Sequence, residues 1–109
     1  NSSSKPRRTI SSLNGLLSAG DTIYVDSGLY TETFAINLDG IFLIGADSSN
    51  TIINPGDSNQ LSIFAISASN KNNLYISKLK IINAYRGIDF YYVNNSIIKD
   101  IQIFKFIFN

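Results

Sequence analysis

The carboxylates are the side chains best suited to acid–base chemistry in this chain, which contains neither His nor Cys. Cleavage of a glycosidic bond needs two of them facing each other across a cleft. Most lie instead in turn sequences, where helix capping and Asx turns account for them, and no spacing places two of them opposite each other. The eight carboxylates are Asp21, Asp26, Glu32, Asp39, Asp47, Asp57, Asp89 and Asp100.

A second group of charged side chains occupies one repeated apolar stretch near the C-terminus, at positions expected to point outward: Lys78, Lys80 and Asp100. A lyase that acts on uronates needs a Lys or Arg base and Asp ligands for calcium. These three residues are therefore candidate contacts for a polysaccharide. The alternative is a lateral surface ion pair between Lys78 and Asp100, which would contribute little to stability. Calcium is expected only if the chain belongs to such an enzyme, and no other cofactor is predicted.

The stretch "YRGIDFYYVNN" gathers aromatic and polar side chains. Carbohydrate sites combine aromatic rings with adjacent polar groups, so Tyr85, Arg86, Asp89 and Tyr91 are candidate carbohydrate contacts. The alternative is a set of ordinary strand aromatics that are half-buried.

Charge and hydropathy exclude two classes of partner. The net charge of +1 is too small for a phosphate-binding footprint, so nucleic acid is not expected. No apolar run approaches the roughly 18 residues that a membrane span needs.

Residues 1–8 hold the one basic cluster and are predicted to form a flexible tail. A cysteine-free surface rich in Asn and Ser fits an extracellular or cell-surface protein.

The elements that position these residues begin with "TISSLNGLLSAG". Its apolar residues Ile10, Leu13, Leu16 and Leu17 recur at helical spacing, which predicts a short amphipathic helix over residues 10–19 with Thr9 as its N-cap. From Asp21 onward, short runs rich in Ile, Val, Phe and Tyr alternate with turns rich in Asn, Asp and Gly. This pattern is typical of β-strands.

A repeat joins the strands into one architecture. The segment that starts at Asn72 aligns with the segment that starts at Asn94, 22 residues later. The offset places Ile76 under Ile98, Leu79 under Ile101 and Ile81 under Ile103, and an earlier alignment places Leu43 on Ile76. Such a repeat predicts a solenoid whose coils stack like residues about 4.8 Å apart. Asn side chains at the corners are expected to form amide ladders.

The first half of the chain resembles the N-terminal part of the pectin lyase-like right-handed parallel β-helix superfamily. That group begins with an amphipathic helix, followed by a "GD-x-I-x-V-x-x-G-x-Y-x-E" run, an "I-x-L-I-G" run and a "T-I-I" run. The resemblance implies right-handed coils whose first turn is covered by the helix, with Tyr30 and Glu32 in polar contacts at the rim. It implies little about activity, because lyases, hydrolases, esterases and adhesins share the fold. The matching residues are Gly20, Asp21, Ile23, Val25, Gly28, Tyr30, Glu32, Ile41, Leu43, Ile44, Gly45, Thr51, Ile52 and Ile53.

We therefore expect an all-β fold: a right-handed parallel β-helix of a few coils with a short N-terminal capping helix, spanning residues 9–109. The apolar residues Phe106, Ile107 and Phe108 stand just before the final Asn109, with no covering helix after the last strand, so we expect the last coil to be covered by missing sequence or by another chain.

The expected function is structural, as the capping portion of an extracellular β-helix that contacts polysaccharide, with no complete active site in these residues. The alternative is the N-terminal fragment of a polysaccharide-degrading enzyme, a uronate lyase or a pectin-esterase-like protein, whose catalytic coils lie beyond residue 109. A third possibility is a module that stacks its open end on a copy of itself.

Overall fold

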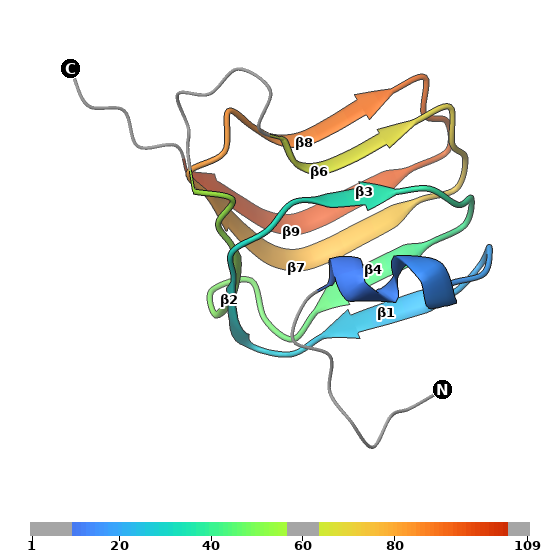
Figure 1. The fold of residues 1–109 in the computed structure, drawn as a ribbon. Helices are drawn as coiled ribbons and strands as arrows, with labels where there is room; N and C mark the ends of the chain where they lie inside the picture. Colours follow the sequence, from blue (N-terminus) through green and yellow to red (C-terminus); the bar gives the residue numbers. More distant parts are fainter. Residues whose placement is uncertain (1–9, 57–63, 105–109) are drawn as a thin grey trace.

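The computed structural model describes residues 10–56 and 64–104, and in these ranges it is a parallel β-solenoid of about three turns. Each turn of the coil carries short strands that pair in parallel with the strands of the next turn (Figure 1). The predicted all-β solenoid is therefore confirmed. The strands are β1 (Thr22–Val25), β2 (Gly28–Tyr30), β3 (Phe34–Ile36), β4 (Phe42–Gly45), β5 (Thr51–Ile53), β6 (Phe64–Ser69), β7 (Tyr75–Ile82), β8 (Arg86–Tyr91) and β9 (Ile97–Phe104).

The strands form two sheets. The six-stranded sheet has the order β1-β4-β7-β5-β2, with β9 paired to β7, and the three-stranded sheet has the order β3-β6-β8. Strand β7 contributes to two faces of the coil, because its first half pairs with β4 and its second half with β5. It can do so because Lys78 has the left-handed backbone conformation (φ 61°), and Asp100 repeats this conformation in β9 (φ 55°).

The predicted register of β7 and β9 is confirmed on both sides of the bend at Lys78 and Asp100. Ile76 pairs with Ile98, Leu79 with Ile101 and Ile81 with Ile103. One turn earlier, Leu43 pairs with Ile76. Inward-facing residues of successive coils therefore lie directly above one another, and the central coil shields its neighbours' apolar side chains from water.

The corner that precedes each strand of the β1-β4-β7-β9 column uses left-handed residues in every coil. Gly40 and Asn73 have φ values of 74° and 62°. The Asn94 side chain donates a hydrogen bond from Nδ2 to Oδ1 of Asn72 (3.3 Å), and the Asn72 backbone N–H donates to Oδ1 of Asp39 (2.8 Å). The expected amide ladder is thus present between Asn72 and Asn94, and a carboxylate takes over the acceptor role in the preceding coil.

The predicted α-helix over residues 10–19 is not found. Ser11–Leu16 form a 3-10 helix, η1, with no side-chain cap, and Leu17 is already extended. The reason lies in the composition of the segment, since Ser and Asn compete for backbone hydrogen bonds and Gly15 has low helix propensity. A helix this short tightens readily into the 3-10 form. Thr9, its expected N-cap, and residues 1–8, the expected tail, lie outside the described residues.

The segment nevertheless packs against the first coil. Ile10 is buried, Leu13 and Leu17 are half-buried against the core, and Leu16 is exposed. The 3-10 helix contacts β3, and Figure 1 shows it in blue below that strand. The Ile10 backbone N–H donates a hydrogen bond to Oε2 of Glu32 (2.8 Å), which ties the segment to the coil.

Candidate functional site

A shallow groove of about 380 Å³ lies on the three-stranded sheet and is lined by both aromatic and polar side chains. It follows the strands from Phe64, at the start of β6, to Tyr91, at the end of β8. Ser67, Ser69, Lys71 and Asp89 contribute its hydroxyl and charged groups.

The register of the sheet explains the hollow. Ala35, Ser67 and Asp89 lie in one column across β3, β6 and β8, and because side chains alternate along a strand, this column faces outward between two inward columns. The side chains of Ala35 and Ser67 are small, so the surface of the sheet is hollowed over these two residues. At one end Phe64 pairs with Arg86, and at the other end Ser69 pairs with Tyr91.

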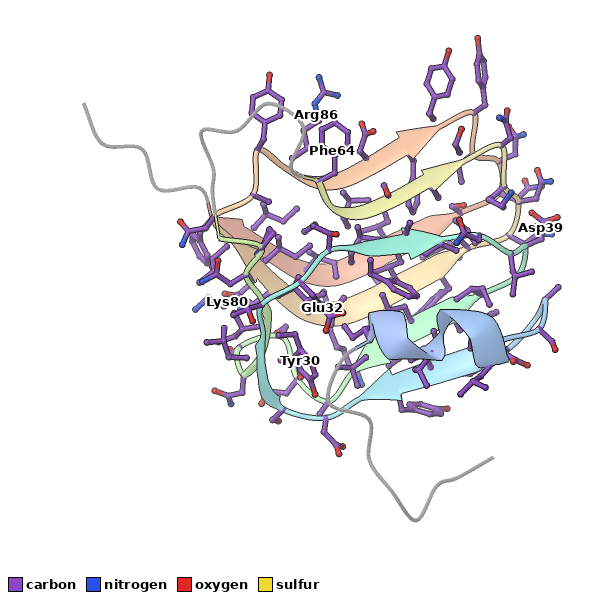
Figure 2. The ribbon with its side chains drawn as sticks, viewed as in Figure 1. Tyr30, Glu32, Asp39, Phe64, Lys80 and Arg86 are labelled. Carbon is purple, nitrogen blue, oxygen red and sulfur yellow. The ribbon has the colours of Figure 1, made fainter. Side chains whose placement is uncertain are left out.

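The guanidinium of Arg86 is held by three neighbours. It donates to Oδ1 of Asp89 (3.3 Å), and its central carbon lies 6.0 Å from the ring centroid of Phe64 and 5.7 Å from that of Tyr85. Figure 2 shows Arg86 and Phe64 together where β6 and β8 begin. Each contact is weak at an exposed site, but together they restrict the orientation of the guanidinium.

An exposed aromatic ring, that of Tyr91, lines the far end of the groove and packs against the ring of Tyr92. Tyr91 and Tyr92 are both exposed, with ring centroids 4.4 Å apart and planes inclined by 65°. An edge-to-face pair of this kind leaves one ring face open. The groove therefore places a ring at each end and hydrogen-bonding groups between them.

Of the predicted contacts, Asp89 and Tyr91 line the groove. Arg86 does not line it but lies beside it, bonded to Asp89 and next to Phe64 and Tyr85. The other three, on the six-stranded sheet, are not part of it. Lys78 and Asp100 occupy the bends of β7 and β9 and are exposed, and no ion pair joins them in the described part of the chain. The Lys80 ammonium lies 5.4 Å from the ring centroid of Phe104, and Figure 2 places Lys80 well away from Arg86.

Eight lining residues were missed by the sequence analysis: Ala35, Ile36, Asn37, Phe64, Ser67, Ala68, Ser69 and Lys71. The 22-residue offset between β7 and β9 also relates β6 to β8, where Phe64 pairs with Arg86 and Ser67 with Asp89. Extending the repeat one strand toward the N-terminus would have identified Phe64, Ser67 and Ser69, because they lie opposite the predicted contacts Arg86, Asp89 and Tyr91.

Tyr30 and Glu32 make structural contacts at the rim, as the resemblance implied. The Tyr30 hydroxyl donates to the backbone oxygen of Asp26 (2.8 Å). Burial raises the pKa of Tyr30, and the negative charges of Asp26 and Glu32 raise it further. Glu32 accepts the backbone hydrogen bond of Ile10.

Asp47 also has the turn role expected of most carboxylates. Its Oδ1 accepts hydrogen bonds from the backbone N–H groups of Ser49 (2.6 Å) and Asn50 (3.1 Å). Nδ2 of Asn50 also donates to Oδ2 of Asp47 (2.9 Å). The backbone bond from Ser49, followed by this side-chain bond, lowers the pKa of Asp47. Its carboxylate is therefore occupied in holding the loop between β4 and β5.

Within residues 10–56 and 64–104, no three His, Cys, Asp or Glu side chains lie close enough together to hold a metal ion. No helix in these ranges has the length and apolar character that crossing a membrane requires.

Comparison with protein-family models, with curated proteins and with solved structures gave no match.

Proposed function

We propose that this chain is a structural segment of an extracellular or cell-surface β-helix, and that the groove on the β3-β6-β8 sheet contacts polysaccharide. The observation that carries the proposal is the combination of Phe64 and Tyr91 with the hydroxyl and charged groups between them. Sugar rings present an apolar face and hydroxyl edges, which match aromatic rings and hydrogen-bonding groups respectively.

The shape of the groove favours a chain-like ligand. Phe64 and Ser69 both line the groove and are five residues apart on β6, which corresponds to roughly 17 Å along an extended strand. The groove is open and shallow, so it suits a few units of an extended polymer better than an enclosed small molecule.

The proposal includes right-handed winding and kinship with the pectin lyase-like superfamily. Support for the kinship comes from the motif residues of the first coils, such as Gly20, Asp21, Ile23 and Val25, and a parallel solenoid is compatible with that fold. Right-handed winding is also the strong preference of crossover connections between parallel strands.

Binding to soluble polysaccharides tests the proposed contact. A panel containing a neutral glucan, a xylan and a polyuronate would be titrated against the wild-type chain by calorimetry. We expect binding to at least one polymer, and Tyr91→Ala should weaken it roughly three- to tenfold, the equivalent of one aromatic contact. Tyr24→Ala removes a ring from β1, on the other sheet, that is even more exposed than Tyr91 (78% against 60%), and it should leave the affinity unchanged.

Absence of binding to every polymer would contradict the proposed contact, as would equal weakening by both variants. The enzyme alternative remains a prediction about sequence beyond residue 109, and no described residue favours it.

A further inference from the structure

The last described strand, β9, leaves apolar side chains exposed at one end of the coil. Ile98 is 46% exposed and Ile103 is 51% exposed, whereas their partners one coil earlier, Ile76 and Ile81, are 0% exposed. In the part of the chain that the structure describes, β9 pairs with β7 along one edge and with no strand along the other. An edge of this kind is a template for pairing with another strand.

The opposite end of the coil does not offer an equivalent surface. Ile10 is buried there, and Leu13 and Leu17 pack against the core of the first coil. The hydrogen bond from Ile10 to Glu32 keeps this segment in place. A copy stacked head to tail on β9 would therefore have to displace the segment.

The order of inward and outward side chains in β9 is symmetric about the bend at Asp100. The inward residues Ile98 and Ile103 lie over buried Ile76 and Ile81. Side chains alternate along a strand, so four other side chains of β9 point outward. They are the polar Lys99 and Gln102 and the terminal apolar Ile97 and Phe104. Reading from either end gives apolar outward, apolar inward, then polar outward.

We infer that the free edge of β9 pairs antiparallel with β9 of a second copy, forming a closed two-fold dimer that joins the open ends of two coils. Ile98 would lie opposite Ile103 of the second copy, Lys99 opposite its Gln102, and Ile97 opposite its Phe104. A two-fold axis between residues 100 and 101 makes each of these pairs twice, as a self-complementary interface requires. It also places Asp100, which is exposed at the bend, opposite Ile101 of the second copy.

The proposed pairing matches the apolar, charged and backbone groups along the free edge of β9. Inward apolar residues meet inward apolar residues, so the interior of each coil continues into the other. Lys99 faces an uncharged amide, so no like charges lie directly opposite each other in these three pairs. The backbone N–H and C=O groups of the free edge gain partners, as in other cases of strand addition.

The oligomeric state of the 109-residue chain tests the inference. Sedimentation equilibrium should show a monomer–dimer equilibrium with no larger species. Ile98→Lys and Ile103→Lys should each raise the dimer dissociation constant at least tenfold, because each places two unpaired ammonium groups in the interface. Both positions are half-exposed in the monomer, so circular dichroism should show retained strands. Leu29→Lys, on exposed β2 of the first coil, should leave the dimer unchanged.

Disulfide trapping tests the direction and register. The chain has no Cys, so a mixture of Lys99→Cys and Gln102→Cys proteins should form disulfide-linked heterodimers, since opposed residues in antiparallel strands lie about 5 Å apart. Lys99→Cys alone should cross-link poorly, because the two copies of residue 99 are three positions apart, roughly 10 Å and beyond disulfide reach.

Three outcomes would overturn the inference. A monomer at all concentrations would mean that other residues of the chain cover the edge, or that it awaits a different protein. Open polymers would indicate head-to-tail stacking. Efficient trapping of Lys99→Cys with itself would place like residues opposite each other and exclude the proposed register.

Discussion

At the scale of single residues, the bends of the coil depend on how closely the backbone of one turn approaches the next. Gly45, at the end of β4, lies against the bend of β7. A β-carbon at this position would collide with the carbonyl oxygen of Lys78 and approach Cδ2 of Leu79 to 2.9 Å. The left-handed conformation of Lys78 turns the β7 backbone at this point, and Gly45 supplies the space.

Gly45→Ala should therefore lower the free energy of unfolding by about 3 kcal/mol, the upper part of the range for overpacking, because the atom it meets belongs to the backbone. Urea denaturation measures the change. Gly15→Ala is the matched control, since a β-carbon there meets nothing within 4 Å and alanine favours helix. Equal losses in both variants would contradict the close approach at the bend.

Ionisation of Tyr30 should make the stability of the fold depend on pH in the alkaline range. Its pKa is raised by burial and then by Asp26 and Glu32, so the unfolded chain releases this proton at a lower pH than the folded chain does. The stabilisation that protonated Tyr30 gives the folded chain is fully present below the ordinary tyrosine pKa of about 10. It is lost as the pH rises through the pKa that Tyr30 has in the folded chain.

Above pH 10 the wild-type chain should accordingly lose stability more steeply with pH than Tyr30→Phe does. The hydroxyl's bond to the Asp26 carbonyl is also lost on ionisation. Urea midpoints between pH 8 and pH 11 measure both slopes. Parallel slopes would show that Tyr30 titrates alike in the folded and unfolded chains.

At the scale of the elements, each strand is stabilised by the strands that pair with it on either side. The same residue type therefore contributes more to stability in an inner coil than in the last one. Ile81 and Ile103 occupy one inward column on β7 and β9. Ile81 is covered by strands on both sides, whereas Ile103 is half-exposed at the edge.

Ile81→Asp should prevent folding, because it buries an unpaired carboxylate in the centre of the stack. Ile103→Asp should cost about 1 kcal/mol or less, since water reaches its side chain. Circular dichroism and denaturation at concentrations low enough to keep the chain monomeric compare the two. A fully stable Ile81→Asp protein would refute the register of β7.

The sequence predicted the stacked strands because Ile76 and Ile98, and Ile81 and Ile103, repeat at one offset. The α-helix was wrong because the apolar spacing of Ile10, Leu13 and Leu17 also fits a segment whose polar residues favour tighter turns. The bend at Lys78 was not foreseen, since a left-handed lysine inside a strand has no local sequence signal.

The candidate groove was predicted only in part, for a similar reason. Arg86, Asp89 and Tyr91 lie on one strand and could be read together. Their neighbours Ser67 and Ser69 become recognisable as part of a surface only when β6 is paired with β8. A surface shared between strands depends on register, and local composition does not specify register.

At the scale of the whole molecule, one end of the stack is covered by the N-terminal segment and the other presents β9. Between them, the outer face of the β3-β6-β8 sheet carries the groove. The coil itself thus supplies two separate surfaces, one along its side and one at its end. Both follow from the same parallel stacking of turns.

Backbone nuclear Overhauser contacts between strands test this stacking most directly. We predict cross-peaks that pair residues 75–77 with 97–99 and residues 79–82 with 101–104, advancing in the same direction along both strands, as the parallel register requires. Cross-peaks that advance in opposite directions within the monomer, as in a hairpin, would contradict the solenoid.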